Sequence, residues 1–284
     1  NIGTVVNIRR KMLRMTMKEL YEGVCSEKTL RNLEHNRAGT HRDIAEELLG
    51  RLGLPAGYHR MGIITDKRET IELYTQWKRL SREFKFAECR EIMNELEKQL
   101  SSNIVNRQFV EWGKNIVAYE LKELDYITYI EKMSDCLGIT IRIEDILSAK
   151  SIYLSNNEKG ILYQISAKYK YNGDESSAFK YIEPIYRKLK ECTDIDIQEN
   201  IKDYEFYMTF AASILGSLGK YEESNIISNK IIRAQLQYGR IAGINCNLSS
   251  MAWNQNKVDE NKKVYNEQLY QCILWSQMSN DRYF

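Results

Sequence analysis

The sequence predicts an all-α protein in which a small N-terminal helical domain precedes a long array of helical repeats. Only two prolines, Pro55 and Pro184, and 15 glycines occur in 284 residues, so residues that break helices are scarce. Beyond the first quarter of the chain, apolar residues recur with helical spacing in paired segments. The length suits one small domain plus a repeat array. We expect the domain at 1–55, a linker at 56–68 and the array at 69–284.

The stretch 16–37 predicts two short helices joined by a tight turn. Thr16 is a good N-cap, and Glu19 three residues later completes a capping box. Gly23 can adopt positive φ and end the first helix. Ser26 then caps a second helix that runs to about residue 35. Two short helices with a glycine in the turn are the signature of a DNA-binding helix-turn-helix.

The second helix of this motif has a buried face and a polar face. Leu30 and Leu33 lie on the buried side, which leaves Lys28 and Asn32 pointing outward. Lys28 and Asn32 are expected to reach base edges in the major groove, and Glu27 can accept a hydrogen bond from cytosine N4. The residues predicted to contact DNA are Arg9, Arg10, Ser26, Glu27, Lys28, Arg31, Asn32 and Arg37.

Charge is distributed unevenly along the chain. Residues 1–60 carry 11 Lys and Arg against 7 Asp and Glu, whereas the remainder carries 30 against 32. A local basic surplus is typical of a surface that contacts phosphates. We expect Arg9 and Arg10 on a first helix, and Arg37 after the second helix of the motif, to touch the DNA backbone. The alternative is an ordinary solvated helix face.

The motif resembles a known class of DNA-binding domain. The pattern GVCS-x-x-TL-x-x-LE is similar to the helix-turn-helix of the phage-repressor (Xre/Cro) class, and in particular to Rgg/PlcR-type regulators of Gram-positive bacteria. Met17 replaces the usual Gln, Tyr21 the usual Ala, and His35-Asn36 the usual Asn-Gly. The resemblance implies a transcription regulator whose tetratricopeptide-like repeats bind a short signalling peptide, as in quorum sensing, and dimerise.

Five helix pairs are predicted after the linker, with Thr40 and Asp43 capping the last helix before it. The pairs are longer than the roughly 34-residue tetratricopeptide unit, so the array is irregular. We expect a right-handed superhelix whose concave face is made by the first helix of each pair. The turns within the pairs are expected near Phe84, Leu124, Gly173, Gly219 and Asn256.

The concave face is suited to an extended peptide. An Asn side chain offers both a donor and an acceptor, so it can pair with a peptide backbone whatever the peptide's sequence. The residues predicted to face this groove are Lys114, Asn115, Tyr163, Lys170, Thr209, Ser213, Asn245, Asn247 and Asn254.

Several functional classes lack support in the sequence. There is no phosphate-binding glycine loop, no metal-ligand spacing among the cysteines and histidines, and no catalytic set, so we expect no enzyme activity and no cofactor. No apolar run approaches the length of a membrane span and no signal peptide is visible, which favours the cytoplasm. The main alternative is a repeat-based adaptor that binds a partner protein and whose N-terminal domain does not read DNA.

Overall fold

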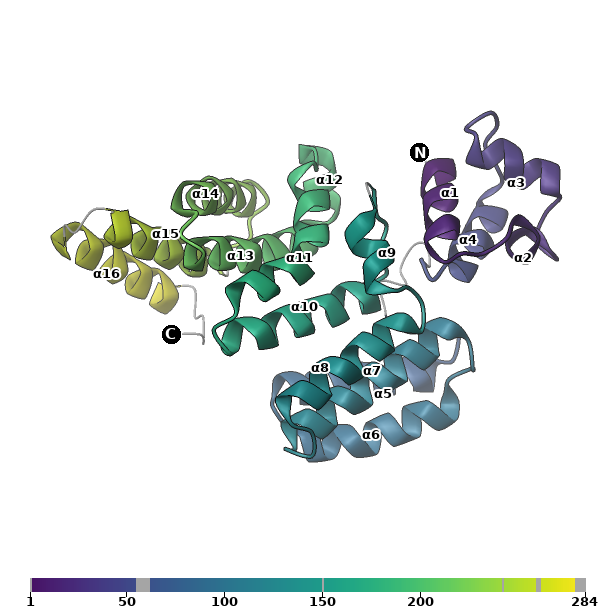
Figure 1. Cartoon of the computed structure of the whole chain (residues 1–284), viewed down its shortest axis with the longest axis horizontal. Coiled ribbons are helices and arrows are strands. Elements are labelled where there is room, and N and C mark those ends of the chain that lie inside the picture. The colour runs from purple at the N-terminus through teal and green to yellow at the C-terminus, as the bar shows by residue number, and fades with distance from the viewer. Residues whose placement is uncertain (1, 55–61, 150, 242, 259–261, 279–284) are drawn as a thin grey trace. The chain divides into compact units, whose positions relative to one another are not determined.

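The protein is all-α in a computed structural model (Figure 1), which describes residues 2–54, 62–149, 151–241, 243–258 and 262–278. These ranges contain sixteen α-helices and no strand. The chain divides into two compact units, Asn1–Ile165 and Ser166–Phe284. The first six residues of the predicted linker, 56–61, lie outside the described residues.

The first four helices pack around one shared core within the first unit. Six fully or almost fully buried side chains, among them Val6, Leu20 and Leu30, make this core. The core positions on α1 and α3 follow the helical spacing seen in the sequence. The helices are α1 (Ile2–Met12), α2 (Met17–Tyr21), α3 (Glu27–Glu34) and α4 (Arg42–Arg51).

The predicted caps of the helix-turn-helix are confirmed. Thr16 and Glu19 form the capping box of α2, and Gly23 has the positive φ (76°) that lets the chain turn. Asn36 follows α3 in the left-handed conformation with φ 57°. The predicted cap of α4 is wrong, because the N-cap is His41 and its side chain makes no capping hydrogen bond.

Two helix pairs follow in the first unit, as predicted. Trp77, Met93 and Phe109 come from three successive helices and share one buried cluster. Phe84 ends the first pair's turn with φ 58°. The turn of the second pair spans 121–125, which includes the predicted Leu124, and Lys122 has φ 62° there. The helices are α5 (Arg68–Arg82), α6 (Phe86–Gln99), α7 (Ile104–Glu120) and α8 (Tyr126–Gly138).

Two short helices were not predicted. They are α9 (Ile143–Ser148) in the first unit and α12 (Asp194–Glu199) in the second. Each has six residues and buries one isoleucine, Ile146 or Ile197, so neither shows a helical period over two turns. The long helix α10 (Asn156–Tyr171) follows α9 and crosses the boundary between the units.

The second unit contains the remaining pairs. Gly173 and Gly219 make the predicted turns, each with φ 78°, and Pro184 lies buried inside a helix as expected. The last turn is predicted near Asn256, and α15 continues through that residue to Val258. The helices are α11 (Glu175–Lys190), α13 (Ile201–Ser217), α14 (Tyr221–Gln237), α15 (Ile244–Val258) and α16 (Lys262–Met278).

Candidate functional site

The helix α3 has a polar face, and its N-terminus is capped by Ser26. The Ser26 hydroxyl accepts a hydrogen bond from the Thr29 amide at 3.1 Å, which fixes the first turn. Leu30 and Leu33 are buried in the domain core. Because those two side chains face inward, Lys28 and its polar neighbours are exposed, which is the arrangement a recognition helix needs in a major groove.

The predicted DNA residues on and after α3 differ in how free they are. Lys28 and Arg37 are exposed, and neither pairs with a carboxylate in the part of the chain that the structure describes. Glu27 and Arg31 form an ion pair with each other along the helix. Asn32 is half-buried one turn after Lys28. The side chains most available to DNA are therefore Lys28 and Arg37, with Asn32 beside them.

Arg9 does not contact solvent, so its predicted role on phosphates is wrong in this conformation. Its side chain is 1% exposed, and its guanidinium binds both carboxylate oxygens of Glu158 at 2.7 and 2.8 Å. It also donates to the carbonyl oxygen of Leu52 at 2.9 Å. Glu158 lies 149 positions away from Arg9 in the sequence, on the first turn of α10. Helical periodicity relates only residues of the same helix, so it could not predict this pair.

Glu158 is fully satisfied in this buried position. It accepts hydrogen bonds from the Thr140 hydroxyl at 2.6 Å and from the Ser155 amide at 2.8 Å, in addition to Arg9. Burial alone would raise the pKa of Glu158, but the Arg9 guanidinium and these donors outweigh it and hold the pKa below its ordinary value. This buried pair, in which the Glu158 carboxylate accepts four hydrogen bonds, fastens α1 to the start of α10.

Arg10 also has a structural role. It makes a bidentate pair with Glu34 at 2.6 and 2.9 Å and donates to the carbonyl oxygen of Met15 at 3.0 Å. The hydrogen bond to Glu34 raises the pKa of Arg10. The Arg10 side chain is only 13% exposed, and its pair with Glu34 holds α1 against α3. Its contact with the DNA backbone stays a prediction.

The groove residues predicted in the first unit are partly committed to other side chains. Lys114 pairs with Glu97 at 2.6 Å, and the neighbouring Asn115 makes a long hydrogen bond of 3.4 Å to the carbonyl oxygen of Lys132. Tyr163 is half-buried on α10. Of Lys114 and Asn115, Asn115 has the longer hydrogen bond and is the less firmly held.

The three asparagines of α15 that are predicted on the groove are not open to solvent, which corrects their predicted position on an accessible surface. Each is at most 1% exposed. The Asn247 amide donates to the Thr209 hydroxyl at 3.1 Å, and Asn245 donates to Ser276 at 2.8 Å. Asn254 donates to Ser224 at 2.9 Å. These amides join α15 to α13, α14 and α16, because a buried amide needs partners wherever packing places it.

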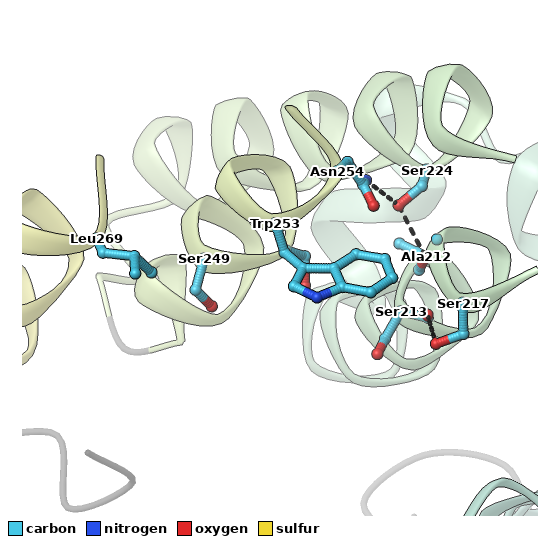
Figure 2. A pocket seen from close by; sticks show the side chains of 10 residues that line it. Ala212, Ser213, Ser217, Ser224, Ser249, Trp253, Asn254 and Leu269 are labelled. Carbon is cyan, nitrogen blue, oxygen red and sulfur yellow. Dashed lines mark hydrogen bonds between the residues drawn. The ribbon is translucent and has the colours of Figure 1, made fainter. Parts of the chain in front are cut away.

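One cavity of about 330 Å³ opens between α13, α14, α15 and α16 (Figure 2). Gly216 is one of its lining residues. The Trp253 indole forms one wall (Figure 2). Hydroxyl groups make up most of its polar lining, and Asn254 is the one α15 asparagine that borders it. The lining hydroxyls belong to Ser213, Ser217, Ser224, Ser249 and Ser250.

Lys170 does not line this cavity itself but hydrogen-bonds to Ser213, which does. Its ammonium donates to the Ser213 hydroxyl at 2.5 Å and lies 5.5 Å from the centre of the Phe210 ring. Burial lowers the pKa of Lys170, and the charge of Glu175 raises it by less. The prediction that Lys170 and Ser213 lie together on one surface of the array agrees with this geometry.

The fold has solved counterparts. PlcR from Bacillus thuringiensis, in complex with the peptide PapR7 and DNA, is 19% identical at a TM-score of 0.56, with 98% of this chain and 95% of that chain covered. The chain described here has the fold of PlcR. The apo form of PlcR is 17% identical at a TM-score of 0.54, with 98% and 99% covered.

A second counterpart is ComR from S. thermophilus, in complex with DNA and its signalling peptide ComS. It is 14% identical at a TM-score of 0.50, with 99% of this chain and 95% of that chain covered. No protein-family model and no curated protein matches the sequence. The resemblance to PlcR-type proteins stated from the motif is thus confirmed at the level of the fold.

The described residues offer little for metal or thiol chemistry. No group of three or more His, Cys, Asp or Glu side chains among them is placed to hold a metal ion. The six cysteines are free thiols, and burial raises the pKa of Cys136 to about 12. No helix in the described ranges is both long and apolar enough to cross a membrane.

Proposed function

We propose that this protein is a sequence-specific, DNA-binding transcription regulator whose helical repeats bind a short signalling peptide that modulates DNA binding. The observation that carries the proposal is the exposed polar face of α3, with Lys28 and Asn32, on a fold shared with PlcR and ComR. Both of those proteins have been solved in complexes that contain DNA and a peptide.

DNA reading is assigned to the N-terminal helices. A capped helix of eight residues with its apolar side buried can enter a major groove with its first turns against the bases. Arg37, just after α3, is placed by sequence to meet a phosphate beside the groove. The DNA-binding domain is 1–55, the linker 56–68 and the ligand-binding array 69–284.

We further propose that the protein acts as a homodimer in the cytoplasm and is not an enzyme. One small helix-turn-helix makes a limited interface, and two linked copies gain affinity by binding two half-sites. The C-terminal helix α16 exposes Tyr270, Ile273 and Leu274, which are 62%, 45% and 41% accessible. Exposed apolar side chains on the last helix favour a contact with a second copy there.

The peptide is expected to act by preferring one arrangement of the chain over another. The helix α10 carries Glu158 in its first turn, where Arg9 of the DNA-binding domain is held. The same helix carries Lys170 in its last turn. A ligand that binds at Lys170 and shifts or stiffens α10 would therefore act through the same helix on Glu158, which holds Arg9 of α1.

Selection of DNA from a random duplex pool by the full chain tests this function. We expect enrichment of a defined sequence with two half-sites, and a change in its affinity when a mixed pool of synthetic heptapeptides is added. No enrichment of any sequence, together with stable capture of another protein by the full chain, would replace the regulator with the adaptor alternative.

A further inference from the structure

Lys170 is a partly buried cation that forms no ion pair with a carboxylate in the described ranges of the chain. Its ammonium has three N–H donors. The Ser213 hydroxyl takes one of them at 2.5 Å, and the Phe210 ring lies 5.5 Å away. Glu175 acts on Lys170 only through space, without a hydrogen bond. At least one strong donor is therefore left for a further group.

Other cations of the same unit show what Lys170 is missing. Lys190 pairs with Glu223 at 3.1 Å, and Arg240 makes a bidentate pair with Glu205. A cation taken partly out of water without a counter-charge costs free energy, and burial accordingly lowers the pKa of Lys170. An anion bound beside Lys170 would offset that cost.

Most of the serines that line the cavity donate their O–H groups to main-chain carbonyl oxygens. Ser217 donates to the carbonyl oxygen of Ser213 at 3.2 Å (Figure 2), and Ser249 and Ser250 both donate to the carbonyl oxygen of Cys246 at 3.0 and 2.9 Å. A serine that donates to its own helix keeps free lone pairs on its oxygen. Those oxygens suit the N–H groups of a peptide backbone.

Trp253 adds an apolar wall to these polar groups. Its indole is 38% exposed and lies across the cavity, between Ser249 on one side and Ser213 and Ser217 on the other (Figure 2). A flat aromatic wall next to hydroxyl acceptors fits a side chain and its adjacent backbone N–H. The ligand chemistry is thus N–H donors with an apolar side chain near one negative charge.

We propose that Lys170 and Ser213 form a carboxylate-binding subsite at the edge of this cavity, and that the carboxylate belongs to a peptide whose neighbouring residues lie along Trp253. The subsite rests on the proposed function, because it assumes that a peptide enters the array. The carboxylate can be the C-terminus of the peptide or an Asp or Glu side chain, and both have the same chemistry.

Binding of synthetic heptapeptides to the full chain tests the subsite. Four random pools are used, with a free or an amidated C-terminus, each with or without Asp and Glu. Peptides retained by the wild type are then measured by calorimetry. We expect the amidated pool without Asp and Glu to bind at least tenfold more weakly than the best of the others. Loss on amidation identifies the C-terminus, and loss on omission of Asp and Glu identifies a side chain.

Variants of Lys170 separate the subsite from general peptide binding. Lys170→Met should lower the affinity for carboxylate-bearing peptides about tenfold or more and leave the affinity for the amidated pool without Asp and Glu unchanged. Lys170→Arg should keep the preference for a carboxylate. Lys220→Met is the matched control, since Lys220 also lies 5.4 Å from a phenylalanine ring, and it should change nothing.

Three results overturn the inference. The first is equal binding of all four pools by the wild type. The second is an unchanged affinity of carboxylate peptides for a folded Lys170→Met protein. In both cases peptide sensing itself survives. If the wild type retains no peptide from any pool, the peptide-sensing part of the proposed function fails together with the subsite.

Discussion

Two arginines that are adjacent in α1 and one that follows α3 show how position decides the role of a residue type. Arg9 is buried against Glu158, and Arg10 is paired with Glu34, so both stabilise the fold. Arg37 is exposed and has no carboxylate partner among the described residues. All three have the same charge, but only Arg37 has its charge available to a phosphate.

Asn32 is the residue at which base reading is most directly tested. Asn can make two hydrogen bonds to an adenine edge in the major groove. Replacement of Asn32 by Ala should cost about 1–3 kcal/mol on the preferred site and leave binding to random DNA almost unchanged. Fluorescence anisotropy on both duplexes measures this. Equal losses on the two duplexes would instead assign Asn32 to folding or to a phosphate.

Arg37 and Arg9 form a matched pair for the phosphate hypothesis. Arg37→Ala should lower the slope of log affinity against log salt by roughly one, because one counterion fewer is released. Arg9→Ala should leave the slope unchanged but destabilise the fold by about 3–5 kcal/mol, since Glu158 loses its buried partner.

Salt titrations and urea unfolding of both variants give these quantities. A lower salt slope for Arg9→Ala in a protein of wild-type stability would show that Arg9 leaves Glu158 and meets DNA in the complex.

At the element scale, close packing of α1 on α3 positions the recognition helix. Gly3 of α1 lies so near the end of α3 that an added Cβ would stand 1.8 Å from the carbonyl oxygen of Leu33. A backbone atom cannot move aside as a flexible side chain does. The absence of a side chain at Gly3 therefore sets how closely the two helices approach.

Two glycine replacements test that packing. Gly3→Ala should destabilise the N-terminal domain by about 1–3 kcal/mol, because α1 must move off α3. Gly50→Ala, inside α4 with nothing within 4 Å of the added Cβ, should stabilise the domain by about 0.5–1 kcal/mol. Urea unfolding of each variant measures the difference. Similar stability for both variants would contradict a tight α1–α3 contact.

At the scale of the whole molecule, the Arg9–Glu158 pair makes stability depend on pH. The pKa of Glu158 is lowered in the folded chain, so the carboxylate form is the one that folding favours. The contribution is complete above the ordinary glutamate pKa of about 4.3 and is lost as the pH falls through the lowered folded value.

The expected result is a pH-dependent gap between the wild type and Glu158→Gln. At pH 7 the wild type should be more resistant to urea, and the difference should shrink steadily below about pH 4 as Glu158 takes up a proton. Lys190 and Glu223, an exposed pair, serve as the control: Glu223→Gln should produce a much smaller gap at pH 7. A gap that stays constant from pH 7 to pH 3 would exclude the buried pair as its source.

The helices, their caps and most of their turns were determined by the sequence itself. The capping box of Thr16 and Glu19 and the left-handed turns at Gly173 and Gly219 depend on residues at most four apart, and those contacts form wherever the chain is helical. The polar face of α3 follows from the same short-range spacing, because the leucines that face the core leave Lys28 outside.

Only the tertiary structure decided which polar residues are available to a ligand. Arg9 finds Glu158 across 149 positions, and Asn247 finds Thr209 across 38. The helix propensity of a charged or amide residue is the same whether its side chain ends up in solvent or against a partner. Its fate is set when distant elements pack together and every buried polar group must be paired, which is why these residues were predicted on binding surfaces and lie inside the fold.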